Sequence, residues 1–190
     1  MYGESSLKSK SKDILNSLSL AWWEALLLLG SGALAVVLHQ SLRLPLGLPG
    51  RHGIEWMALL VLGRSTSRFR WAGSLTSTGA ALTSLMPFWG VRDDPFIWLI
   101  YLLPGIVMDL VFYWLPQLQN KLWFWASLGG LAHATKPLAR WVISLASGWA
   151  YGSLLNGVLY PLSTHILFGM LGGLLGAAIS LTGKRLIESK

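Results

Sequence analysis

Cysteine is absent from this 190-residue chain, and charged residues make up only 12% of it. The lack of cysteine excludes disulfides, thiolate metal ligands and cysteine nucleophiles. Soluble domains carry about 25% charged residues, whereas 53% of this chain is hydrophobic. The composition therefore predicts an integral membrane protein, and the length leaves no room for an additional soluble enzyme module.

Catalytic signatures are also missing. The chain has no Gly-x-Ser-x-Gly elbow, no His-Glu-x-x-His helix, no Walker loop and no paired-acid motif. We therefore expect no enzymatic activity and no cofactor, with a membrane enzyme of unrecognised site as the last alternative. The net charge of +7 does not indicate a nucleic-acid partner, because most of it follows the expected membrane topology.

Apolar sequence is abundant and falls into six segments. A membrane span needs about 20 residues, so the second segment is too short to span alone. It is expected either to be shielded by neighbouring helices or to be re-entrant. The third is rich in small and hydroxyl residues, which is typical of a helix packed among other helices. The predicted fold class is all-α, an integral membrane bundle of six transmembrane helices: Leu20–His39, Ile54–Arg64, Trp71–Trp89, Pro95–Leu115, Leu122–Trp149 and Val158–Leu181.

Lysine and arginine are distributed unevenly between the two ends of these segments. An excess of basic residues in short loops marks the cytoplasmic side of a membrane protein. Both termini are therefore expected in the cytoplasm of a multi-pass protein of the inner or plasma membrane. The cytoplasmic side would carry Lys8, Lys10, Lys12, Arg64, Arg68, Arg70, Lys121, Lys184, Arg185 and Lys190, and the outer side only Arg43, Arg51 and Arg92.

The same topology divides the chain into a cytoplasmic N-terminal segment 1–19, a membrane domain 20–183 and a cytoplasmic tail 184–190. The basic N-terminal segment before an apolar run resembles the layout of a signal peptide. No cleavage site follows it, so the first apolar segment is expected to remain as a membrane helix.

Three basic residues interrupt the fifth segment at helical spacing. His133, Lys136 and Arg140 fall on one stripe, and Pro137 loosens the helix there. Ionisable groups at bilayer depth are costly, so they face a protein interior, a cavity or a partner. Asp109 in the fourth segment is the expected ion-pair partner of Lys136 or Arg140. This pair is either purely structural or part of a polar pocket for a small ligand with hydrogen-bonding or anionic groups.

The outer loop 41–53, between the first two segments, contains two prolines and three glycines. It is therefore expected to be a shaped, non-helical segment rather than a minimal turn. It leads into Arg51, His52, Glu55 and Trp56, which are spaced to cluster at a helix start. A simple interfacial ion pair between Arg51 and Glu55 is the alternative to a binding role.

Histidines and tryptophans complete the candidate site. His39, His52 and His165 are expected to approach one another in the outer half of the bundle, but they lack the close spacing of a metal motif, so no metal is assigned. Most tryptophans fit an aromatic belt at the membrane interfaces; Trp56 and Trp141 do not. The candidate substrate-binding residues are Arg51, His52, Glu55, Trp56, Asp109, His133, Lys136, Arg140, Trp141 and His165.

The last segment carries a ridge of small residues, Gly169, Gly172, Gly173 and Gly176. Such a ridge allows close approach of helices. It serves either internal packing or a contact between subunits. The second use is the basis of an alternative function, that of a non-transport membrane assembly or scaffold protein.

The layout from about residue 20 to 181 resembles the substrate-binding S-components of energy-coupling factor vitamin transporters of prokaryotes. In that family an outer loop covers a ligand pocket, and an Ala-x-x-x-Ala motif on the first helix docks on a transmembrane coupling subunit. Here the loop Ser41–Gly53 corresponds to the lid, and Ala21 and Ala25 match the docking motif.

The resemblance implies capture of a small solute, vitamin-like or another micronutrient, for ATP-driven uptake. The partners would be the coupling subunit, separate ATPase subunits and the lipid bilayer. A related branch, the cobalt and nickel permeases, uses a Met-His N-terminus as metal ligand, whereas this chain begins Met-Tyr-Gly. A transition-metal permease subunit is kept as an alternative.

Overall fold

The computed structural model describes residues 21–42, 48–86 and 94–188, and this part of the chain is helical without a strand. The predicted all-α fold is therefore confirmed. The predicted N-terminal segment 1–19, residues 43–47 of the outer loop, residues 87–93 and the last two residues lie outside the described part. The helices are α2 (Trp22–Ser41), α3 (Gly53–Thr66), α4 (Ala72–Ser84), α5 (Ile97–Trp114), α6 (Leu122–Ser147) and α7 (Leu159–Glu188), with short 3-10 turns η1 (Pro116–Leu118) and η2 (Gly152–Leu154).

Each helix corresponds to one of the six predicted segments. The C-terminal ends of two helices differ most from the predicted ends. Helix α4 ends at Ser84 rather than near Trp89, and Pro87 in the sequence disfavours helical backbone in the residue before it. Helix α7 continues to Glu188, through most of the predicted tail, where basic residues suit a helix C-terminus. Of the described helices, α2, α5 and α7 are long and apolar enough to cross a membrane.

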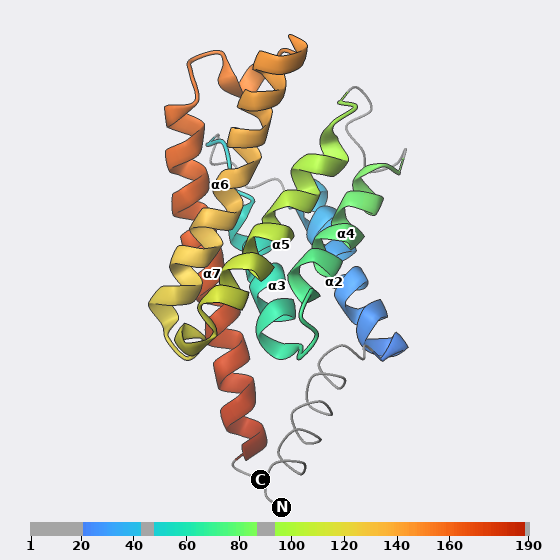
Figure 1. The fold of residues 1–190 in the computed structure, drawn as a ribbon, viewed down its shortest axis with the longest axis vertical. Helices are drawn as coiled ribbons and strands as arrows, with labels where there is room; N and C mark the ends of the chain where they lie inside the picture. Colours follow the sequence, from blue (N-terminus) through green and yellow to red (C-terminus); the bar gives the residue numbers. More distant parts are fainter. Residues whose placement is uncertain (1–20, 43–47, 87–93, 189–190) are drawn as a thin grey trace, which may run out of the picture.

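Helix α3 lies in the middle of the bundle. The chain runs up and down, and α2, α4, α5, α6 and α7 contact one another in that order, while α3 packs mainly on α7 and also contacts α2, α4 and α6 (Figure 1). Trp56, Met57, Leu60 and Val61 of α3 are at most 1% exposed. With only 14 residues, α3 is shorter than the roughly 20 residues of a span. Neighbouring helices shield it, which agrees with the first of the two predictions for this segment.

The third segment, which its small residues predicted to be packed among other helices, is largely buried. Nine of the 13 residues of α4 are buried: Ala72, Gly73, Thr76, Ser77, Gly79, Ala80, Ala81, Thr83 and Ser84. Hydroxyls of this helix bond to its own backbone, as Thr76 Oγ1 does to the carbonyl oxygen of Ala72 at 2.9 Å. This satisfies the threonines without a partner helix, so α4 can pack closely on both α2 and α5.

The four ridge glycines of α7 pack inside the chain. Two face α6 and two face α3, and a Cβ at any of them would collide with a backbone oxygen of the facing helix. The contacts are Gly169 with Gly129, Gly173 with Trp125, Gly172 with Gly53 and Gly176 with Ala58. The ridge therefore serves internal packing in this structure.

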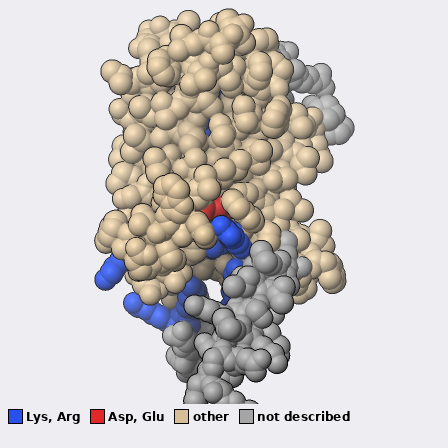
Figure 2. Space-filling model, in the orientation of Figure 1, with Lys and Arg blue, Asp and Glu red and all other residues tan. Residues whose placement is uncertain are grey.

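Basic side chains gather at one end of the bundle. Figure 2 shows Lys and Arg near the lower end of the face in view, while the upper surface is almost free of them. The exposed basic residues at the helix ends on that side are Arg68, Arg70, Lys121, Lys184 and Arg185. We call this the inner end of the bundle and the opposite one the outer end.

Two glycines of α2 give a matched test of the packing. A Cβ at Gly32 would collide with the carbonyl oxygen of Thr76 and lie 2.8 Å from the backbone nitrogen of Ala80, whereas a Cβ at Gly30 meets nothing within 4 Å. We expect Gly32→Ala to destabilise the protein by about 1–3 kcal/mol. Gly30→Ala should be neutral or stabilising, because alanine favours a helix by about 1 kcal/mol over glycine. Thermal unfolding in detergent measures both, and equal midpoints would contradict this packing.

Candidate solute-binding site

Buried ionisable side chains form two groups, one at each end of α3. The inner pair consists of Arg64 and Asp109, which are 5% and 2% exposed. The outer cluster surrounds the start of α3. Its members, connected by the contacts described below, are His39, Arg51, His52, Glu55, Trp56, Asp94, Tyr101, His133, Lys136, Arg140, Tyr151 and His165.

The inner pair joins three helices. Arg64 Nε at the end of α3 lies 3.5 Å from Asp109 Oδ1 on α5, and Arg64 Nη1 donates to the carbonyl oxygen of Phe69 at 2.6 Å. Asp109 also accepts the backbone N–H groups of Gly73 (3.0 Å) and Ser74 (2.6 Å) in the first turn of α4. A carboxylate at this position satisfies N–H groups that have no partner within the helix. Both oxygens of Asp109 are thus used structurally.

The predicted pairing of Asp109 with Lys136 or Arg140 is wrong. Asp109 lies five residues before the end of α5 at Trp114, whereas Lys136 lies 14 residues after the start of α6 at Leu122. Since the two helices are antiparallel and rise about 1.5 Å per residue, the side chains are at different depths. Arg64, which the charge count placed in a cytoplasmic loop, is the partner instead.

Two histidines and a glutamate meet where α2 ends and α3 begins. The ring centroids of His39 and His52 are 4.0 Å apart, and His52 Nδ1 lies 2.8 Å from Glu55 Oε1. One ligand atom from each of the three residues lies within 4.8 Å of the others. Two imidazoles and one carboxylate form a donor set that suits a divalent transition metal.

A second histidine pair fixes the turn before α3. The rings of His133 on α6 and His165 on α7 stack with centroids 4.7 Å apart. His133 Nε2 donates to the carbonyl oxygen of Gly50 at 3.3 Å, and His165 Nδ1 donates to that of Pro161 at 2.6 Å. Gly50 has a φ of +77°, and a Cβ there would lie 2.6 Å from His165 Nδ1. Glycine is therefore required at this turn.

Lys136 lies deeper in the outer cluster and is 7% exposed. Its Nζ is 4.1 Å from the ring centroid of Trp56 and 4.4 Å from that of Tyr101. The two rings meet edge to face, with centroids 5.1 Å apart. No hydrogen bond or ion pair of Lys136 occurs in the part of the chain that the structure describes. Its electrostatic neighbours are Arg140 and Glu55.

The rim of the outer cluster carries Arg140, Tyr151 and Asp94. Arg140 Cζ lies 5.6 Å from the ring centroid of Tyr151, whose hydroxyl donates to Asp94 Oδ1 at 3.1 Å. Partial burial and the Asp94 carboxylate raise the pKa of Tyr151 to about 12, so this hydroxyl stays protonated as a donor at neutral pH.

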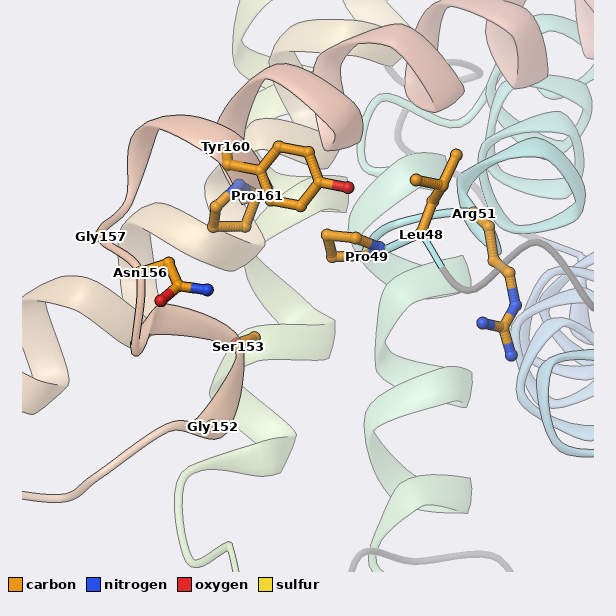
Figure 3. Close-up of a pocket in the computed structure, with 9 residues that line it drawn as sticks. All are labelled: Leu48, Pro49, Arg51, Gly152, Ser153, Asn156, Gly157, Tyr160 and Pro161. Atoms are coloured by element: carbon orange, nitrogen blue, oxygen red, sulfur yellow. The ribbon is translucent and has the colours of Figure 1, made fainter.

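Two cavities reach the outer cluster from the outer end. One, of about 350 Å³, lies between residues 48–51 before α3 and residues 152–161, which run from η2 into the first turn of α7, and Arg51 contributes to its wall (Figure 3). The other, of about 380 Å³, is lined by Asp94, Arg140 and Tyr151 among others. Both include Gly152 and Ser153, so they flank the same 3-10 turn. Small-molecule sites have volumes of about 300–1,000 Å³.

Most of the predicted site residues lie together. Two do not: Asp109 belongs to the inner pair, and the side chain of Trp141 is 43% exposed on the outside of α6. The prediction missed Asp94, Tyr101 and Tyr151, and it named His39 without including it in the site. Only His39 carried a signal in the sequence. The predicted residues that the structure brings together are Arg51, His52, Glu55, Trp56, His133, Lys136, Arg140 and His165.

Comparison of the chain with protein-family models, curated proteins and solved structures finds no match. The functional argument therefore rests on the geometry of the chain itself.

The inner pair predicts a specific pattern of stability. We expect Arg64→Met and Asp109→Asn each to destabilise the protein by about 3–5 kcal/mol, the usual cost of leaving one buried charge without its partner. The asparagine amide would also turn a donor toward the N–H of Gly73 or Ser74. Thermal unfolding of both variants and of the double variant measures the coupling. The double variant should lose less than the sum of the two; simple additivity would contradict a direct pair.

The exposed Lys184 provides the control for this experiment. It donates to the carbonyl oxygen of Ser65 at 3.2 Å from the surface of the inner end. Lys184→Met should change the free energy of unfolding by less than about 0.5 kcal/mol.

Proposed function

We propose that this chain is the substrate-binding subunit of a membrane transporter. It would span a prokaryotic cell membrane six times with both termini in the cytoplasm, and capture a small solute from outside. A coupling subunit and separate ATPases would drive uptake, as the resemblance to energy-coupling factor S-components implies. The solute would be vitamin-like or another micronutrient.

The observation that carries this proposal is a large polar cluster enclosed by apolar helices at the outer end. Lys136, His133, His165 and Trp56 are at most 7% exposed. Two cavities at the outer end are lined by other members of the cluster, Arg51 in one and Asp94, Arg140 and Tyr151 in the other. Ionisable groups at membrane depth mark solute or ion pathways more often than they serve packing. The basic inner end supports the orientation, since cytoplasmic loops carry more lysine and arginine.

The start of α2 has a surface suitable for the coupling subunit. Trp22, Trp23, Leu26 and Leu27 are more than half exposed, beside the partly exposed Ala21 and Ala25. Glu24 lies within this alanine motif but turns inward, where it accepts a hydrogen bond from Ser67 Oγ at 2.5 Å. The only charge in the motif is therefore bonded to the residue that follows α3, and the exposed residues beside it are apolar.

A transition-metal permease subunit is the second candidate function. The single observation in its favour is the approach of His39, His52 and Glu55. Against it, Arg51, Lys136 and Arg140 act electrostatically on His39, and nearby positive charges oppose binding of a divalent cation. The scaffold alternative is weaker, because the glycine ridge on which it depended packs internally.

The lack of cysteine makes the topology directly testable. Asn156 between α6 and α7 and Gln117 between α5 and α6 are both exposed, at opposite ends of the bundle. A cysteine at either position would be the only thiol in the chain. We expect a membrane-impermeant maleimide to label Asn156→Cys in intact cells, and Gln117→Cys only after permeabilisation. The reverse pattern would invert the proposed orientation.

Native mass spectrometry tests the function. Protein extracted in mild detergent should retain a small organic molecule and copurify with ATPase subunits. Arg140→Gln should reduce the retained fraction, because Arg140 lines the outer cavity, whereas the exposed Trp141 can be changed to Phe without effect. An adduct that a chelator removes would favour the metal permease instead. Protein with neither adduct nor ATPase partners would refute the transport proposal.

A further inference from the structure

The buried lysine of the outer cluster forms no ion pair with any residue that the structure describes. Lys136 is 7% exposed, and its ammonium lies over the rings of Trp56 and Tyr101. Cation–π contacts offset part of the cost of burying a charge, but a buried ion usually needs a hydrogen-bonded partner as well. The chain supplies such a partner elsewhere: Arg64 is equally buried and has Asp109 and the carbonyl of Phe69.

The carboxylates of the cluster are already bound to other groups. Glu55 is bonded to His52. Asp94 accepts the Tyr151 hydroxyl and the backbone N–H of Phe96. Among the described residues neither forms an ion pair with a lysine or arginine of the cluster. Among its described residues the outer cluster has three basic side chains, Arg51, Lys136 and Arg140, and two carboxylates, an excess of one positive charge.

In the described part of the outer cluster, most of the buried side-chain nitrogens that lack a hydrogen bond are donors. They are Nε of Arg51, Nε of Arg140 and Nε1 of Trp56. The fourth, His133 Nδ1, is an unpaired acceptor, because the other ring nitrogen donates to Gly50. A site with unsatisfied donors and one excess positive charge favours a ligand that carries acceptors and one negative charge.

We infer that the solute is a small organic monoanion whose carboxylate binds between Lys136 and Arg140, next to the aromatic pair Trp56 and Tyr101. Lys136 and Arg140 are four residues apart on α6, so they project from the same face of the helix. A carboxylate has two oxygens and can accept from both. The aromatic rings then pack against the apolar part of the solute. This inference rests on the proposed function and specifies the chemical class of its substrate.

Matched probes that differ only in charge test the inference. Benzoate and benzamide share a ring, and acetate and acetamide form a smaller pair. Ligand-free protein in detergent is unfolded thermally at about 50 mM probe and matched ionic strength, with tryptophan fluorescence as the readout, because a ligand that binds the folded state raises the midpoint. We expect at least one carboxylate to raise the midpoint and its amide to have no effect.

Lys136→Met separates a ligand-binding role from a structural one. The affinity for the carboxylate should fall about tenfold or more, as expected for loss of a charge-assisted hydrogen bond. Without a probe, this variant should unfold at a higher temperature than the wild type, because it removes an unpaired buried charge. A structural cation would give the opposite result, as predicted for Arg64. Lys121→Met, at an exposed inner position, is the control and should respond to carboxylates like the wild type.

Several outcomes would overturn the inference: equal effects of acid and amide, no effect of either carboxylate, or a carboxylate effect that persists in Lys136→Met. Its failure is distinguishable from failure of the proposed function. A neutral solute retained by the purified protein would refute the monoanion while leaving transport intact. Carboxylate-specific stabilisation of a protein that copurifies with no ATPase would support the monoanion and refute the transport proposal.

Discussion

Enclosure of α3 by its neighbours is the constraint on which the rest of the structure depends, since eight of its 14 residues are buried. A helix of 14 residues is about 21 Å long, shorter than the roughly 30 Å hydrocarbon core of a bilayer. In a bilayer its terminal backbone groups could not face lipid without partners, so other helices would have to shield them. Close approach is possible because glycines of α7 lie against its backbone. The polar residues at both ends of α3 are then accessible only to protein or to a cavity.

The two ends of α3 use their charges differently. At the inner end, an arginine forms an ion pair with an aspartate that also accepts two N–H groups from the first turn of α4, which links three helices. At the outer end, the charged and aromatic groups come from α2, α3, α5, α6 and α7, and among the described residues Lys136, Arg51 and Arg140 form no ion pair. Because consecutive helices are antiparallel, the inner pair and the outer cluster lie at different depths in the bundle. The inner pair can therefore stabilise the fold, while side chains of the outer cluster remain available to a ligand.

The sequence was sufficient to predict the helices and much of the outer cluster, but not the pairing of charges. Apolar runs and the i, i+3, i+7 spacing of His133, Lys136 and Arg140 depend on local periodicity, which the sequence contains. The pairing of Asp109 depends on relative helix depth, and its true partner, Arg64, has the sequence context of a loop charge. Tyr101 and Tyr151 could not be identified because a tyrosine near a membrane interface most often belongs to the aromatic belt.

The unequal lengths of the helices affect how the solute would reach its site. Helix α7 has 30 residues, about 45 Å of helix, and the tips of α6 and α7 extend beyond the other helices at the outer end (Figure 1). Hydrophobic mismatch of this size is relieved by tilting or by projection into water. Because residues 152–161, from the connection between these tips into the first turn of α7, form one wall of an outer cavity, its mouth would lie above the acyl chains. Entry would then be from the aqueous phase rather than laterally from the lipid.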